Sequence, residues 1–106
     1  MSRRRSIDFD RINGEALVHL DAICRRLLSD GKREGQEYVA LNPRRSDRHL
    51  GSFKVNRHNG RWADFATGDK SGDPISLVAY LANVSQAEAA RLLARMLDLE
   101  GQRASR

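Results

Sequence analysis

The chain has 106 residues, of which 40% are hydrophobic and 31% are charged, and its formal net charge is +5. This length allows one domain with a modest core, and no apolar run reaches the length of a membrane span. The start of the chain lacks the hydrophobic segment of a signal peptide, and its single cysteine cannot form an internal disulfide, so we expect a protein of the reducing cytoplasm.

The two ends of the chain differ in composition from its middle. Residues 1–7 are rich in arginine, and residues 100–106 are mostly small and polar. Segments of this kind bury too little apolar surface to stay ordered. We therefore expect flexible tails over 1–7 and 100–106 and a single folded domain over 8–99.

Apolar residues recur at helical spacing between residues 8 and 30, which predicts an N-terminal helix. An Asn-Gly dipeptide at 13–14 weakens its beginning, so the strong part of the helix is expected to start near Glu15. Gly31 follows as a candidate C-cap. Cys24 lies on the apolar stripe and is expected to pack rather than to react, because nothing near it in the sequence would lower its pKa.

Three later segments are rich in β-formers or alternate between apolar and polar residues. They span residues 36–41, 51–57 and 61–66 and predict a small three-stranded antiparallel sheet. The dipeptide Asn59-Gly60 lies between the last two segments and is a strong signal for a hairpin turn.

The length of this turn decides which side chains share a face. If Asn59-Gly60 forms a two-residue turn, Lys54 lies opposite Phe65, whereas a longer loop would shift the register and exchange the assignments. In the two-residue register, the polar and basic face carries Lys54, Asn56, His58, Arg61, Ala63 and Phe65. The mainly apolar face, which should meet the helices, carries Phe53, Val55, Arg57, Trp62, Asp64 and Ala66.

The last third of the chain predicts two helices. Asp73-Pro74 is typical of an N-cap followed by proline at the first helical position, and the apolar residues up to Leu81 indicate a short buried helix. Ser85 and Glu88 have the spacing of a capping box that begins another helix. The predicted fold is therefore α+β, with a three-stranded antiparallel sheet packed against an N-terminal helix and two C-terminal helices.

The positive charge is concentrated in the predicted sheet. Residues 42–62 contain six lysines and arginines and one aspartate, so their excess equals the net charge of the whole chain. A local excess of this kind is typical of a surface that binds a polyanion. The alternative is a basic surface that serves only solubility.

Five short motifs follow one another along the predicted elements. They are YVALNP at 38–43, SFKV at 52–55, WADF at 62–65, GD at 72–73 and ISLVAYL at 75–81. In their order and spacing they resemble the N-terminal zinc-ribbon domain of bacterial and phage DNA primases. The resemblance covers most of the chain. It implies a zinc-ribbon-like hairpin that helps to recognise single-stranded template DNA, while a separate catalytic domain joins the nucleotides.

That family holds zinc with cysteine and histidine, and this chain has neither at the corresponding positions. The resemblance places the four ligand positions at Asn42, Arg45, Asp64 and Thr67. Structural zinc requires thiolate and imidazole ligands in a tetrahedral array, which these side chains cannot supply. We therefore expect a degenerate zinc ribbon with no metal and no other cofactor.

Arg45 and Asp64 are expected to lie close together, since both positions would contact the metal in the zinc form. A charge-assisted pair between them, with Asn42 and Thr67 completing a hydrogen-bond network, would replace part of the metal's contribution to stability. The alternative is that the four positions have become ordinary polar surface residues.

The sequence has no phosphate-binding Gly-x-x-x-x-Gly-Lys loop, no paired-carboxylate metal site and no nucleophile–base pair. We interpret the chain as a non-catalytic module that binds single-stranded DNA in primase-associated replication of a plasmid, phage or mobile element. Its basic residues would contact phosphates, and Trp62 and Phe65 would stack on bases unless they pack in the core. The candidate interface comprises Arg44, Arg45, Arg48, Lys54, Arg57, His58, Arg61, Trp62 and Phe65.

A second hypothesis is a protein-interaction subunit that docks onto a replicative helicase or a primase without contacting DNA. It predicts an exposed apolar patch on the last two helices that includes Tyr80, Leu93 and Met96. The two hypotheses differ in whether the chain binds oligonucleotides with an affinity that falls as salt rises.

Overall fold

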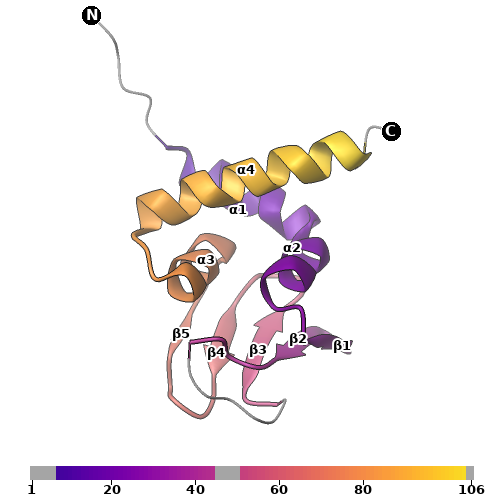
Figure 1. The fold of residues 1–106 in the computed structure, drawn as a ribbon, viewed down its shortest axis with the longest axis vertical. Helices are drawn as coiled ribbons and strands as arrows, with labels where there is room; N and C mark the ends of the chain where they lie inside the picture. The colour runs from indigo at the N-terminus through magenta and orange to yellow at the C-terminus, as the bar shows by residue number, and fades with distance from the viewer. Residues whose placement is uncertain (1–6, 45–50, 105–106) are drawn as a thin grey trace, which may run out of the picture.

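Helices cover one face of an antiparallel sheet, and no helix covers the other face, which we call the open face although Val39 is only 2% exposed there (Figure 1). The computed structural model describes residues 7–44 and 51–104. In these residues the helices are α1 (Phe9–Val18), α2 (Leu20–Leu27), α3 (Pro74–Ala82) and α4 (Gln86–Ala104). The strands are β1 (Lys32–Glu34), β2 (Glu37–Ala40), β3 (Phe53–Asn56), β4 (Trp62–Asp64) and β5 (Lys70–Ser71), and they pair in the order β1-β2-β3-β4-β5.

The predicted α+β class is confirmed, but the predicted sheet of three strands is wrong because the described residues form five. The two additional strands lie at the edges of the sheet, and every residue in them is exposed. β1 turns into β2 through Gly35, whose φ of +60° suits a tight hairpin. Short polar edge strands have no apolar alternation, so the hydrophobic pattern did not predict them.

The predicted N-terminal helix is divided into two at His19. Its start near Glu15 is also corrected, because α1 already begins at Phe9, where the Asp8 side chain accepts a hydrogen bond of 3.0 Å from the backbone N–H of Arg11. His19 has φ −111° and ψ 22°, which ends α1 and allows α2 to run in a new direction. None of the helices in the described ranges is long and apolar enough to cross a membrane.

Gly31 is not the C-cap that the sequence predicted, because α2 ends at Leu27 and is capped at Leu28. Its role is steric. A Cβ atom at Gly31 would lie 2.4 Å from the Tyr38 ring and 2.7 Å from the carbonyl oxygen of Val39, so only glycine lets this segment pass so close to β2.

The helices at the end of the chain begin as predicted, with an Asp73 capping box and with Ser85 accepting a hydrogen bond from the N–H of Glu88. α4 continues to Ala104, past the domain boundary expected at residue 99. At the other boundary, Ile7 packs against the core although the tail was expected to include it, and the rest of that tail lies outside the described residues.

The β3–β4 hairpin has a longer loop than the two-residue turn. Lys54 lies opposite Ala63 and not opposite Phe65, and the N–H of Asn56 donates to the carbonyl of Arg61 at 2.7 Å. The predicted register is therefore wrong by two residues. Because side chains alternate with a period of two, this shift leaves the strand residues on their predicted faces.

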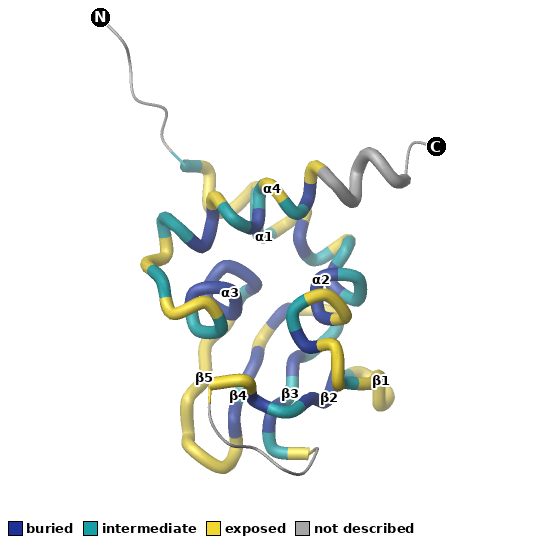
Figure 2. The backbone as a smooth tube through the Cα atoms, in the orientation of Figure 1, coloured by how far each residue is buried: buried dark blue, intermediate teal, exposed yellow. Residues whose placement is uncertain are grey.

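The core has two layers that meet at α3. One layer lies between α1, α3 and α4, and the other lies between the inner face of the sheet and helices α2 and α3 (Figure 2). Cys24 belongs to the second layer with 1% of its surface exposed, as the sequence predicted. Burial raises the pKa of its thiol to about 12, so this sulfur is packed and unreactive.

Alanine substitutions at two glycines should change the free energy of unfolding in opposite directions. Gly60→Ala should lower the free energy of unfolding by more than about 1 kcal/mol, because Gly60 has φ +77° and a Cβ would lie 2.8 Å from Pro74. Gly14→Ala, in an exposed turn of α1 with no atom within 4 Å, should raise it by about 0.5–1 kcal/mol. Urea unfolding measures both, and a stable Gly60→Ala variant would contradict the described packing of the hairpin on α3.

Candidate nucleic-acid interface

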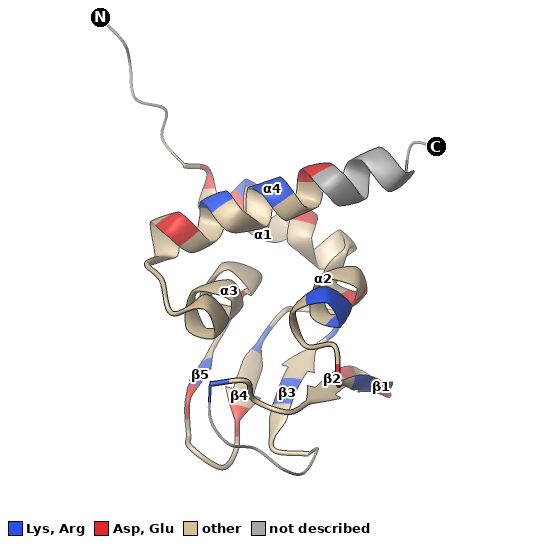
Figure 3. Cartoon of the chain, viewed as in Figure 1, with Lys and Arg blue, Asp and Glu red and all other residues tan. Residues whose placement is uncertain are grey.

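The open face of the sheet carries a row of directly opposed residues that crosses all five strands. Going from β1 to β5, the row reads Lys32, Val39, Lys54, Ala63 and Lys70. Opposed residues in neighbouring strands share a face, so the three lysines lie on alternate strands, roughly 10 Å apart. Basic residues accordingly recur on β1, β3 and β5 in the view of Figure 3.

A shallow groove of about 580 Å³ runs over the β3, β4 and β5 part of this open face. Lys54, Arg61 and Lys70 line it, together with one acidic side chain, Glu37. The groove therefore carries an excess of positive charge in a place that no helix covers. The remaining lining residues are Asn56, Asn59, Trp62, Ala63, Phe65, Ser71 and Gly72.

The cations of the groove differ in how they are paired. Lys54 Nζ lies 3.7 Å from a carboxylate oxygen of Glu37, and both side chains are about one-third exposed. Among the described residues, no carboxylate lies within the 4.0 Å of an ion pair from Arg61 or Lys70, and both are exposed. Arg61 and Lys70 are thus the cations most available to an anionic ligand.

Of the two aromatic residues predicted to stack on bases, only Phe65 offers a free ring. Phe65 is 70% exposed, and the Lys54 ammonium lies 5.8 Å from its ring centroid. Trp62 is 5% exposed, its ring centroid lies 4.6 Å from that of Tyr80, and its Nε1 donates to Ser76 Oγ at 3.1 Å. Trp62 therefore belongs to the core, and its assignment to the interface is corrected.

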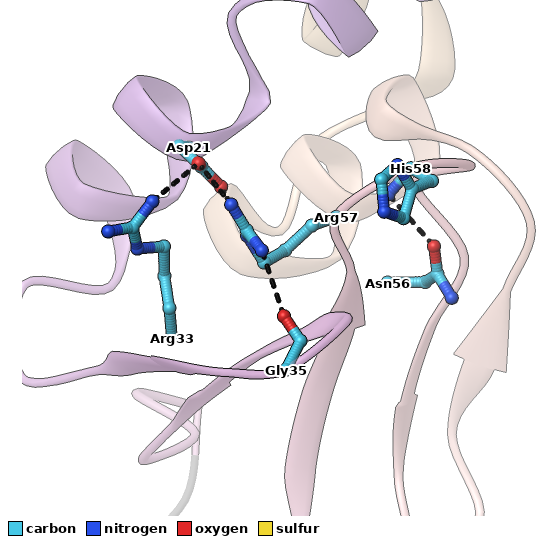
Figure 4. Close-up of polar contacts among 6 residues, drawn as sticks. All are labelled: Asp21, Arg33, Gly35, Asn56, Arg57 and His58. Atoms are coloured by element: carbon cyan, nitrogen blue, oxygen red, sulfur yellow. Dashed lines mark hydrogen bonds and ion pairs between the residues drawn. The ribbon is translucent and has the colours of Figure 1, made fainter.

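Arg57, predicted to contact phosphate, instead fastens the hairpin to α2 (Figure 4). Its guanidinium donates to both carboxylate oxygens of Asp21, at 2.9 and 2.8 Å, and to the carbonyl of Gly35 at 2.8 Å. Through hydrogen bonding and charge, Arg57 holds the pKa of Asp21 below its ordinary value. These three hydrogen bonds tie the end of β3 and the β1–β2 turn to α2, so Arg57 has a structural role. We call this contact the Arg57–Asp21 bracket.

His58 lies in the exposed turn that follows β3. Its backbone N–H donates to Asn56 Oδ1 at 2.9 Å, and so does the N–H of Asn59, so Asn56 shapes the turn (Figure 4). His58 is exposed beyond the end of the strand and does not line the groove with Lys54 and Arg61.

Three arginines of the loop after β2, Arg44, Arg45 and Arg48, were predicted to belong to the interface. Arg44 is exposed, and its guanidinium carbon lies 5.1 Å from the centroid of the Tyr80 ring, a cation–π contact. Arg45 and Arg48 lie outside the described residues, and so does the predicted Arg45–Asp64 pair.

Two of the four degenerate metal positions meet in a buried hydrogen-bond network. Asn42 is 1% exposed and Asp64 is not exposed at all, and the Asn42 amide nitrogen donates to Asp64 Oδ2 at 2.7 Å. Its other hydrogen reaches the Tyr80 hydroxyl at 2.9 Å, and Tyr80 donates to Asp69 Oδ2 at 2.8 Å. Burial raises the pKa of Tyr80, which keeps the phenol protonated as a donor.

Thr67 does not join Asn42 as predicted. It is exposed, and its hydroxyl accepts a hydrogen bond of 3.2 Å from the N–H of Asp69 in the loop between β4 and β5. The network therefore links the segment after β2 to β4 and α3, with Tyr80 in the place predicted for Thr67. Within residues 7–44 and 51–98, no three His, Cys, Asp or Glu side chains are grouped so that they could hold a metal ion.

Lys70 and Tyr80 belong to this region, although neither was among the residues predicted for the interface or for the degenerate metal positions. Lys70 was not predicted because it lies in a two-residue strand, which is too short to show alternation. Tyr80 was counted among the apolar residues of the predicted short buried helix and, under the second hypothesis, placed in an exposed apolar patch, without a hydrogen-bonding role. A signal was present, however, since a tyrosine in such a helix needs a partner for its hydroxyl.

Comparison with known proteins does not assign this chain to a family. No protein-family model, no curated protein and no solved structure gives a significant match to the chain.

The Arg57–Asp21 bracket should make stability depend on pH. The pKa of Asp21 is lower in the folded chain than in the unfolded one, so its contribution to stability is present at neutral pH and is lost as the pH falls through the folded value. Wild type should exceed Asp21→Asn in free energy of unfolding at pH 7, and the difference should narrow below roughly pH 4. Asp98→Asn, an exposed change in α4, serves as control; a constant Asp21→Asn effect at all pH values would contradict the bracket.

The buried network should make Asn42 important for stability. Asn42→Ala removes a donor from Asp64, which is fully buried, and should lower the free energy of unfolding by about 1–3 kcal/mol. Tyr80→Phe keeps the ring in place and removes only the bridging hydroxyl, so it should cost about 0.5–1.5 kcal/mol. Urea unfolding tests both, and an Asn42→Ala variant as stable as wild type would show that the network contributes nothing.

Proposed function

We propose that the chain is a non-catalytic cytoplasmic module that binds single-stranded nucleic acid, most simply template DNA, across the open face of β3–β5. The observation that carries the proposal is the groove in which Lys54, Arg61 and Lys70 lie beside the exposed ring of Phe65. A single strand offers both phosphates and unpaired bases, and this groove has a partner for each of them.

The arrangement of charge and ring fits a strand better than a small anion. The opposed positions Lys54 and Lys70 are separated by two strand spacings, roughly 10 Å, so they serve successive sites along an extended backbone. Stacking of one base on Phe65 would contribute about 1–3 kcal/mol. The groove is shallow and lies on the side of the sheet that no helix covers, so an extended chain can reach it from solvent.

The resemblance to primase zinc-ribbon domains supports DNA as the ligand and replication of a plasmid, phage or mobile element as the process. In that context the chain would present template to a partner, and the buried Asn42–Asp64 network would take the place of the metal in shaping the hairpin. Arg44 would extend the basic surface beyond the groove.

A second candidate function, docking onto a helicase or primase, is favoured by an apolar groove of about 480 Å³. Leu27 of α2, Val78 and Leu81 of α3, and Leu92 and Met96 of α4 line this groove. It includes Met96, one of the three residues predicted for an exposed patch. The other two do not contribute: Leu93 is fully buried, and Tyr80 does not line the groove.

Salt dependence tests the proposed binding directly. The affinity for a fluorescently labelled single-stranded oligonucleotide, measured by anisotropy, should fall as salt rises, because binding releases counterions from the phosphates. Arg61→Ala and Lys70→Ala should each weaken binding and flatten the log–log slope by about 0.7, the value for one phosphate of a single strand. Lys54→Ala should act in the same direction, and Phe65→Ala should weaken binding without changing the slope.

Arg91→Ala is the matched control, since it removes one positive charge from the exposed side of α4, far from the sheet. It should leave both the affinity and the slope close to the wild-type values. Absence of binding at low salt would refute the proposal and favour docking of a protein at the apolar groove.

A further inference from the structure

The open face of the sheet has a basic half and a neutral half. The neutral half lies over β1 and β2, where Glu34 and Glu37 are directly opposed. Lys32 Nζ lies 3.6 Å from Glu34, and Lys54 Nζ lies 3.7 Å from Glu37, so each glutamate holds one lysine of the row. The basic half lies over β4 and β5, where Arg61 and Lys70 have no such partner among the described residues.

Without these glutamates, the lysine row would be basic across its whole width. Lys32, Lys54 and Lys70 span four strand spacings, roughly 20 Å, and the part from Lys54 to Lys70 spans roughly 10 Å. Because the two glutamates pair with Lys32 and Lys54, the unpaired positive charge of the described part of this face lies on its β4–β5 side, at Arg61 and Lys70. Glu37 also lines the groove itself, so a strand that moves toward β2 meets a carboxylate.

We propose that Glu34 and Glu37 determine the specificity of this face, by confining a nucleic acid to the β3–β5 half and thereby favouring a single strand over a duplex. The inference rests on the proposed function. A single backbone can follow Lys54, Arg61 and Lys70 and place a base on Phe65. A duplex carries a second backbone and hides its bases, so it gains no stacking on Phe65 and brings twice the phosphate charge to a face whose other half carries the two glutamates.

Like-charge contact is the physical basis of this discrimination. Two phosphate backbones carry twice the charge of one for the same length, and carboxylates opposite one of them repel it. A single strand can avoid the glutamates by shifting toward β5, whereas a rigid duplex cannot bend around a charged edge at low cost. The glutamates therefore cost the single strand less than they cost the duplex.

The test replaces both glutamates and compares the two ligands. Glu34→Gln with Glu37→Gln should tighten binding of a labelled duplex about tenfold, and binding of the single strand of the same sequence by less than about threefold, since each exposed charge contact is worth a few-fold in affinity. Anisotropy titrations at one low and one physiological salt concentration give the duplex-to-single-strand ratio of affinities. The gain should shrink at the higher salt concentration.

The matched control is the double variant Glu15→Gln with Glu88→Gln. It changes the net charge equally and also releases two cations from ion pairs, because Glu15 pairs with Arg11 at 3.0 Å and Glu88 with Arg91 at 3.2 Å, both on helices. Its ratio should equal that of wild type. An unchanged ratio in the sheet variant, or an equal change in the control, would overturn the role of Glu34 and Glu37. Failure of wild type and both variants to bind either ligand would instead refute the proposed function.

Discussion

The antiparallel pairing of β3 with β4 determines which side chains meet the helices and which meet solvent. Val55 opposes Trp62 on the inner face, and Lys54 opposes Ala63 on the outer face. A slip by one residue would bury Lys54 and expose Phe53, which is fully buried and packs against the rings of Trp62 and Tyr80. The close approach of Gly60 to Pro74 fixes where the hairpin turns, so the packing of α3 and the position of the basic groove depend on the same register.

A buried polar network of Asn42, Asp64 and Tyr80 joins the segment after β2 to β4 and α3. Asn42 uses both amide hydrogens, one on Asp64 and one on Tyr80, and its oxygen accepts from the N–H of Arg44. Hydrogen bonds of this kind contribute about 0.5–1.5 kcal/mol each, much less than the about 10–16 kcal/mol of a structural zinc. Most of the stability must therefore come from the two apolar layers around α3.

The parts of the fold that were predictable are those that depend on local chemistry or on periodicity. The caps of α3 and α4 and the inner positions Phe53, Val55 and Trp62 follow from short patterns in the sequence. The face assignments survived a wrong turn length because the error was an even number of residues. The break at His19 was not predictable, since the apolar stripe of the sequence continues through it.

The candidate site was predictable only in part, for a related reason. Positive charge in the sequence indicated a basic surface, but only the three-dimensional pairing separates Arg57, whose donors are used by Asp21 and Gly35, from Arg61, which points to solvent. Lys70 joins the surface through an edge strand of two residues that has no signature of its own. Composition therefore indicates that a surface is charged, while strand pairing decides which charges act together.

Because the single cysteine is buried, its reactivity can be used to measure local opening of the core. Cys24 lies on the side of α2 that packs against the sheet, and its side chain is 1% exposed. Burial raises the pKa of its thiol, so the thiol keeps its proton at neutral pH. An alkylating reagent can reach the sulfur only when α2 lifts from the strands, so the rate of labelling counts those openings. Labelling rates measured with and without a ligand on the opposite face would therefore show whether binding changes how often the helices separate from the sheet, with no engineered probe.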